Sequence, residues 1–176
     1  MSLFGNLDAV SDLPAPIAEA VSIMLSEIEE SGEHTTADET SLAIEAVFIY
    51  LGRLWVAEYL HLATRQSDAL DEGLNRYLFE ALGRKLLLGH WVGLSRRIHQ
   101  HFVSNQLETA LPGLVAQDFG TPGDMEHPVA KLVSFRNAFS HGSFSAVVDE
   151  IRSHRQLLET LLEGLPALAE HCLVFN

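Results

Sequence analysis

The sequence predicts an all-α protein, a bundle of about five or six helices. Apolar residues recur three and four positions apart over most of the chain, and several of these repeats begin at proline or end at glycine. No region is rich enough in strand-forming residues to support a sheet. With 47% hydrophobic and 20% charged residues, a chain of 176 residues can bury a core as one domain. We expect that domain over residues 14–171, after a flexible segment over residues 1–13.

The first predicted helix begins at Pro14 and Pro16, since proline is well suited to the first turn of a helix. Its apolar residues then repeat at helical spacing until Gly32.

The second predicted helix is much longer. Asp38 can cap its start, and it ends near Arg65. Its wide apolar face runs from Leu42 to Leu62 and includes one acidic residue, Glu58. A face of this width predicts the central core helix.

Two further helices and a loop follow. Residues 68–82 predict a shorter helix that Gly83 breaks, and residues 86–107 predict a long helix with a basic, histidine-rich face. Residues 112–127 hold five prolines and glycines, so we expect a long loop there.

The last two helices follow this loop. Pro128 opens the first of them, and Gly142 stands where a left-handed cap ends a helix. Ser145 can cap the last helix, which residues 164–166 should bend or split because they include Gly and Pro. Residues 172–176 look like the start of a truncated strand or a linker, so we expect the natural chain to continue.

The net charge of −13 is distributed unevenly. Residues 1–80 hold fifteen acids against three Arg or Lys, and the remaining 96 residues hold nine against eight. Such a field repels nucleic acid at long range, so we expect no DNA partner and no broad coating of RNA. Residues 81–107 nevertheless contain no acid. They carry four basic residues, Arg84, Lys85, Arg96 and Arg97.

The sequence predicts a cytoplasmic protein without a membrane partner. Its best apolar run, residues 42–51, contains Glu45 and is shorter than the roughly 20 residues that span a bilayer. The amino terminus lacks the pattern of a signal peptide, and the single cysteine, Cys172, forms no internal disulfide. Neither HExxH nor CxxC occurs, so we expect no metal, and nothing indicates another cofactor.

The best candidate site is a polar cluster at a predicted helix end, formed by Arg136, Asn137 and His141. The spacing by itself is uninformative, because Arg96 and His101 are also five positions apart. The setting distinguishes the cluster, since helix ends can present side chains to a cleft while the helix body stays packed.

This stretch resembles the HEPN domains, which are all-helical and share an Arg, a following polar residue that is often Asn, and a His after four to six intervening positions. The resemblance is specific over residues 132–144, and residues 88–92 are similar to HEPN-like amino-terminal regions of larger bacterial proteins. It implies a metal-independent endoribonuclease that acts on single-stranded RNA. In that family pattern, Arg and His from two protomers meet in a homodimer cleft.

The residue types suit that chemistry. His141 can exchange a proton near neutral pH, and Arg136 can place two hydrogen bonds on a phosphate. Asn137 can orient either partner or the substrate. Residues five apart on a regular helix point about 140° apart, so Arg136 and His141 need either an unwound last turn or a second copy to act together.

Alternatives remain for each part of this interpretation. Arg136 can instead pair with an acid of the last helix or the loop, and His141 can interact with the helix carboxy terminus. Arg96, Arg97 and Lys85 can hold RNA phosphates or form a solvated or salt-bridged face.

The whole domain has alternatives too. It can be a non-catalytic dimerisation module of a larger protein, regulated by a partner or a downstream domain, or it can be a nucleotide sensor that uses the basic residues. As a purely structural module, the protein should melt at a lower temperature after Arg136→Ala and should cut no RNA.

Overall fold

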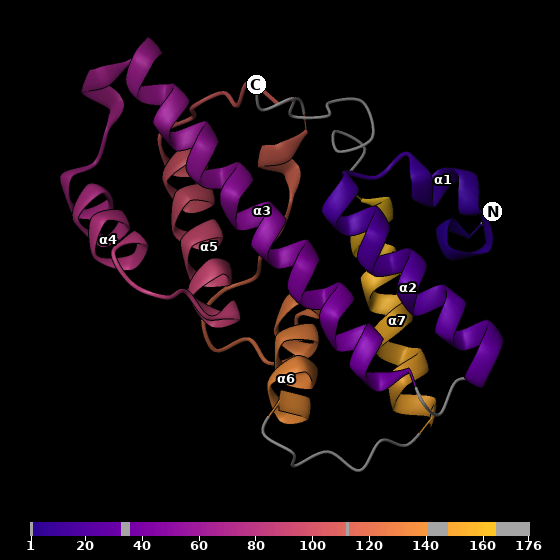
Figure 1. Ribbon diagram of the computed structural model, residues 1–176. Coiled ribbons are helices and arrows are strands. Elements are labelled where there is room, and N and C mark those ends of the chain that lie inside the picture. The colour runs from indigo at the N-terminus through magenta and orange to yellow at the C-terminus, as the bar shows by residue number, and fades with distance from the viewer. Residues whose placement is uncertain (1, 33–35, 112, 141–147, 165–176) are drawn as a thin grey trace. The chain divides into compact units, whose positions relative to one another are not determined.

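Helices are the only regular secondary structure in the part described by the computed structural model, residues 2–32, 36–111, 113–140 and 148–164 (Figure 1). No strand occurs among these residues, so the all-α prediction is confirmed. The α-helices are α1 (Leu7–Ser11), α2 (Ala15–Ser31), α3 (Ala37–Arg65), α4 (Glu72–Leu82), α5 (Leu88–Ser104), α6 (Pro128–Ser140) and α7 (Val148–Glu163). Three 3-10 turns accompany them, η1 (Leu3–Gly5), η2 (Ser67–Ala69) and η3 (Leu114–Ala116).

Most helix boundaries lie close to the predicted ones, and one predicted helix is divided. Asp38, predicted to cap the second helix, lies instead within the first turn of α3, which begins at Ala37. The helix expected over residues 68–82 consists of η2 and a separate α4. Asp71 is the N-cap of α4, because its Oδ1 accepts a hydrogen bond from the Leu74 N–H at 2.6 Å. The predicted cap residues Gly142 and Ser145 and the closing residues 172–176 lie outside the described residues.

The chain divides into two compact units. The first unit comprises residues 1–47 and 122–176, and the second comprises residues 48–121. Helix α3 supplies residues to both. Since the first unit joins the two ends of the chain, no local pattern in the sequence reveals it.

The amino-terminal segment, expected to be flexible over residues 1–13, contains η1 and α1. Backbone N–H groups of η1 donate to α7: Phe4 to Glu159 at 2.8 Å and Leu3 to Glu163 at 3.2 Å. These partners lie more than 150 residues further along the chain, so the sequence offered no local signal for them. Val10 is almost fully buried as well.

Each unit has its own apolar core. The buried side chains of the first unit include Ile17, Val21, Met24, Ile44, Val47, Leu132, Phe135, Ile151 and Leu158. Those of the second include Leu51, Trp55, Tyr59, Leu78, Leu94, Ile98, Phe102, Leu114 and Phe119. Most of them are the apolar residues that helical spacing selects.

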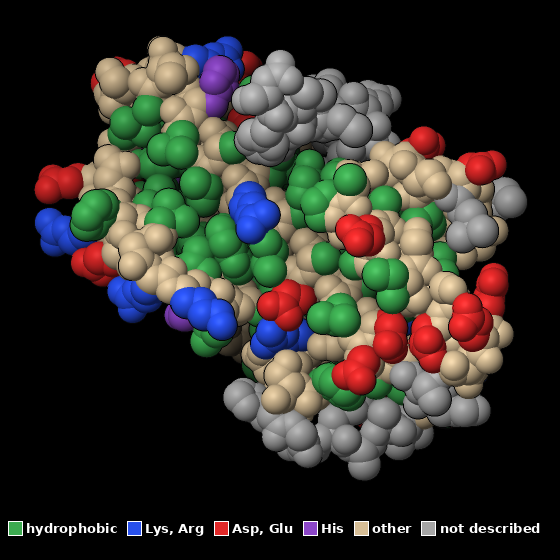
Figure 2. All heavy atoms as spheres, viewed as in Figure 1, with side chains coloured by type: hydrophobic (Ala, Val, Ile, Leu, Met, Phe, Trp, Pro, Cys, Tyr) green, Lys and Arg blue, Asp and Glu red, His purple; other side chains and the backbone are tan. Residues whose placement is uncertain are grey.

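The amino-terminal part of the chain, which supplies α2 and the start of α3, is strongly acidic. No Lys or Arg occurs before Arg53, although ten acidic residues precede it. In Figure 2, acidic side chains gather beside apolar ones over α2 and the start of α3.

Helix α3 is long and apolar enough to cross a membrane by length and composition alone. In this protein 56% of its most apolar 18-residue stretch is buried, as expected of a core helix.

Close contact between α3 and α5 in the second unit predicts a sensitive glycine. A Cβ atom on Gly52 would lie 2.6 Å from Cε3 of the Trp91 ring, so we expect Gly52→Ala to lower the free energy of unfolding by about 1–3 kcal/mol. A Cβ atom on Gly89 of α5 would meet no atom within 4 Å, so Gly89→Ala should raise the free energy of unfolding by up to about 1 kcal/mol. Urea denaturation measures both, and equal effects would contradict the steric explanation.

Tyr59 predicts alkaline sensitivity. The pKa of Tyr59 is raised, mainly because its hydroxyl is buried. The Asp71 N–H donates to this hydroxyl and lowers the pKa, whereas the negative charge of the Asp71 carboxylate raises it. The folded state therefore holds this proton more tightly than the unfolded state does. We expect the stabilisation to be complete below about pH 10 and to be lost as the pH rises through the folded pKa.

The free energy of unfolding in urea, measured between about pH 8 and pH 11, tests this expectation. Tyr59→Phe should lower stability at every pH, because the hydroxyl also lies 2.9 Å from Asn75 Oδ1, but it should flatten the alkaline decline. An unchanged decline in this variant would assign it to other groups.

Candidate functional site

Helix α6 positions the first two residues of the predicted site. Its buried face, Val129, Leu132 and Phe135, anchors it in the first unit, and the Phe135 ring stacks on His154 of α7 with 4.4 Å between centroids. Arg136 and Asn137 follow this anchor directly and lie near the carboxyl end of the helix.

Arg136 makes an ion pair across the first unit. Its Nη2 donates to Oε2 of Glu45 on α3 at 2.7 Å, and its Nε donates to the same oxygen at 3.2 Å. Its Nη1 lies 3.4 Å from Oδ1 of Asn137. The two charged side chains are only 18% and 31% exposed, so solvent screens the pair less than it screens a surface pair.

The pair holds the guanidinium in one orientation. Only one edge of the group faces Glu45, and N–H groups on Nη1 and Nη2 remain without a protein acceptor among the described residues. From the sequence, any acid that pairs with Arg136 was predicted to lie in the last helix or the loop. The partner lies instead on α3, 91 residues earlier, where its place within an apolar run gave no sign of this role.

The third predicted site residue, His141, lies outside the described residues. Its position relative to Arg136 and Asn137 is therefore a prediction from sequence alone.

The basic residues predicted to hold substrate belong to the second unit. The Arg96 guanidinium donates to the Phe119 carbonyl oxygen through Nη2 at 2.9 Å and through Nε at 3.3 Å. Arg97 is exposed and stacks over the Tyr77 ring, 3.9 Å from its centroid. Lys85 is exposed between α4 and α5. Arg96 thus holds the loop after α5, while Arg97 and Lys85 reach solvent.

The second Arg and His pair at the same spacing has structural contacts. His101 Nε2 lies 2.9 Å from the Ala69 carbonyl oxygen, and Arg96 holds Phe119 as described. The neighbouring His99 makes a comparable contact with the Val115 carbonyl oxygen at 2.9 Å. These three polar side chains of α5 thus provide hydrogen-bond partners for backbone carbonyl groups outside the α-helices.

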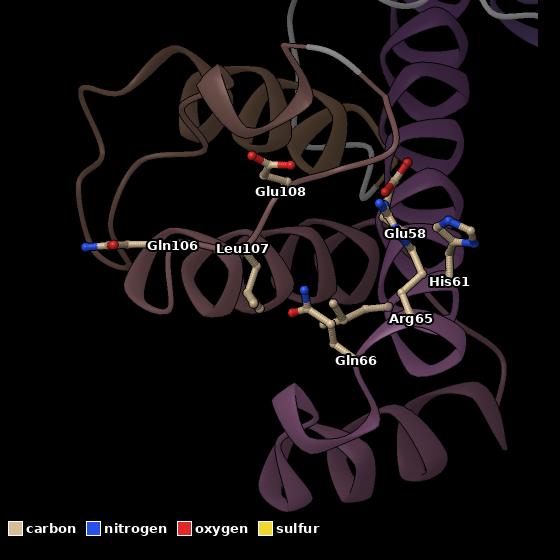
Figure 3. A pocket seen from close by; sticks show the side chains of 8 residues that line it. Glu58, His61, Arg65, Gln66, Gln106, Leu107 and Glu108 are labelled. Carbon is tan, nitrogen blue, oxygen red and sulfur yellow. The ribbon is translucent and has the colours of Figure 1, made fainter.

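A polar pocket that the sequence did not predict lies in the second unit, at the carboxyl ends of α3 and α5 (Figure 3). Its volume is about 360 Å³. Glu58 is 6% exposed, and its carboxylate accepts the N–H groups of Ala110 at 2.8 Å and Leu111 at 3.2 Å. The other lining residues are His61, Leu62, Arg65, Gln66, Gln106, Leu107 and Glu108.

The Glu58 carboxylate in this pocket already binds backbone of the same chain. In the sequence, the only sign of this role was an acidic residue, Glu58, within an apolar helix face. The structure explains its burial, because its carboxylate binds two backbone N–H groups of the loop after α5. Across the described residues, no group of three or more His, Cys, Asp and Glu side chains is arranged to hold a metal ion.

Comparison of the chain with protein-family models, with curated proteins and with solved structures gives no match.

The ion pair between Arg136 and Glu45 predicts measurable coupling. A double-mutant cycle with Arg136→Ala and Glu45→Ala should give an interaction energy of about 1 kcal/mol in urea denaturation, because the pair is partly buried and has two donors on one oxygen. The exposed pair Arg76–Glu72, 3.7 Å apart on α4, is the matched control and should give at most about 0.5 kcal/mol. Equal coupling in the two cycles would contradict a special role for Glu45.

Proposed function

We propose that this chain is a HEPN-like endoribonuclease domain that cleaves single-stranded RNA without a metal ion, in a cleft between two copies. The observation that supports it most is the Arg136–Asn137 pair near the end of α6, where Glu45 orients the guanidinium of a residue five positions before His141 in the chain. An oriented cation reduces the reorganisation needed when charge develops on the phosphorus oxygens.

In the proposed reaction, one His141 removes the proton from a ribose 2′-OH, and the 2′ oxygen attacks the adjacent phosphorus. The bond from phosphorus to the 5′ oxygen breaks, and His141 of the second copy protonates the leaving oxygen. The products are a 2′,3′-cyclic phosphate and a free 5′-OH. Arg136 donates to the phosphorane oxygens through the N–H groups that Glu45 does not occupy, so Glu45 acts as a positioning residue.

A second candidate function is a non-catalytic interaction module of a larger protein. The same ion pair favours it, because a carboxylate 2.7 Å from Nη2 neutralises much of the charge that would attract a phosphate. In that case Arg136 stabilises the first unit and binds no substrate.

Cleavage of RNA in EDTA separates the two functions. The proposal expects fluorescently labelled single-stranded RNA to be cut to products with cyclic phosphate ends, and His141→Ala to slow this at least about 100-fold. Arg136→Lys keeps the charge but loses the planar fork, so it should also slow cleavage. The exposed His61 of the second unit provides the control, since His61→Ala should cleave like the natural protein.

Two results would count against the nuclease. Full activity in His141→Ala would remove that residue from the mechanism. Absence of cleavage by the natural protein, together with a lower melting temperature in Arg136→Ala, would favour the interaction module.

A further inference from the structure

A shallow groove separates α2 from the start of α3 in the first unit, and it has no part in the proposed cleavage. Its volume is about 260 Å³, and both helices contribute to its walls. The lining residues are Pro16, Glu19, Ala20, Ile23, Glu39 and Leu42.

Two large aliphatic side chains in this groove face solvent. Ile23 on α2 is 53% exposed and Leu42 on α3 is 60% exposed, whereas their neighbours Met24 and Ile44 are fully buried. The sequence placed Leu42 on the buried face of its helix, and the structure corrects this because no described part of the first unit covers it. Single exposed leucines are ordinary, but two aliphatic side chains in one groove form an apolar floor.

The surroundings of this floor are acidic. Glu19 and Glu39 line the groove, and Figure 2 shows acidic side chains beside apolar ones over α2 and the start of α3. An acidic lining around two exposed aliphatic side chains is complementary to a partner that carries both basic and aliphatic side chains.

We propose that this groove binds a basic amphipathic helix of a partner protein. An aliphatic side chain of that helix would contact Ile23 and Leu42, and its Lys or Arg residues would pair with Glu19 and Glu39. The net charge of −13 speeds the approach of such a partner. A second copy of the same surface is disfavoured because it would oppose acid to acid, and nucleic acid or an anionic membrane is repelled.

A labelled helical peptide of about 18 residues, with leucine on one face and lysine on the other, is a suitable probe for fluorescence anisotropy. Leu42→Ser should weaken its binding to the full chain about tenfold. Ile23→Ser removes the aliphatic contact from the other helix and should act in the same direction. The double variant Glu19→Gln/Glu39→Gln should weaken binding about fivefold and reduce its salt dependence.

The chain offers a closely matched control. Leu60 is 59% exposed on the same helix but belongs to the second unit, so Leu60→Ser should bind the peptide like the natural protein. A peptide with glutamate in place of lysine should not bind. Apart from the half-buried Glu39, the variants replace exposed side chains, and their melting curves verify folding.

Three outcomes would overturn the proposal: unchanged binding in both Leu42→Ser and Ile23→Ser, an equal loss in Leu60→Ser, or self-association of the natural protein that Ile23→Ser abolishes. The last outcome would mean that a second copy occupies the groove. None of these measurements involves RNA cleavage, so the docking proposal and the nuclease proposal can fail independently.

Discussion

The need to cover a long apolar helix governs this protein. Helix α3 has 29 residues, and most of its large apolar side chains between Ala43 and Leu62 are buried, although Leu60 is exposed. A helix of this kind is stable in water only when other helices cover it along its length. The chain meets this need with two sets of elements: residues from both ends of the chain complete one core, and residues 48–121 complete the other.

Burying so much of α3 also buries polar groups, and each unit has its own solution. In the second unit Glu58, Arg96 and His99 bind backbone groups of the segment after α5. That segment has few helical hydrogen bonds of its own, so side chains from α3 and α5 supply partners for its backbone. In the first unit Glu45 meets a cation, Arg136, at 2.7 Å.

The pair formed by Glu45 and Arg136 therefore has two aspects. It satisfies a partly buried acid, which is a requirement of folding. It also fixes a guanidinium close to the end of a helix, which is a requirement of any site that binds phosphate there. Whether the second property is used depends on chemistry near His141, and this makes RNA cleavage the informative measurement. The acidic groove on α2 and α3 is a separate surface with a different charge preference.

The sequence by itself determined the all-α class and the approximate extent of most helices, because the spacing of apolar residues and helix-starting prolines such as Pro128 are local properties. It also identified Arg136 and Asn137 as a polar cluster at a helix end. Only the tertiary structure decided that Glu45 is the partner of Arg136, that Glu159 holds the amino terminus, and that Leu42 is exposed. Each of these depends on which distant segments pack together, and no periodicity along the chain records that.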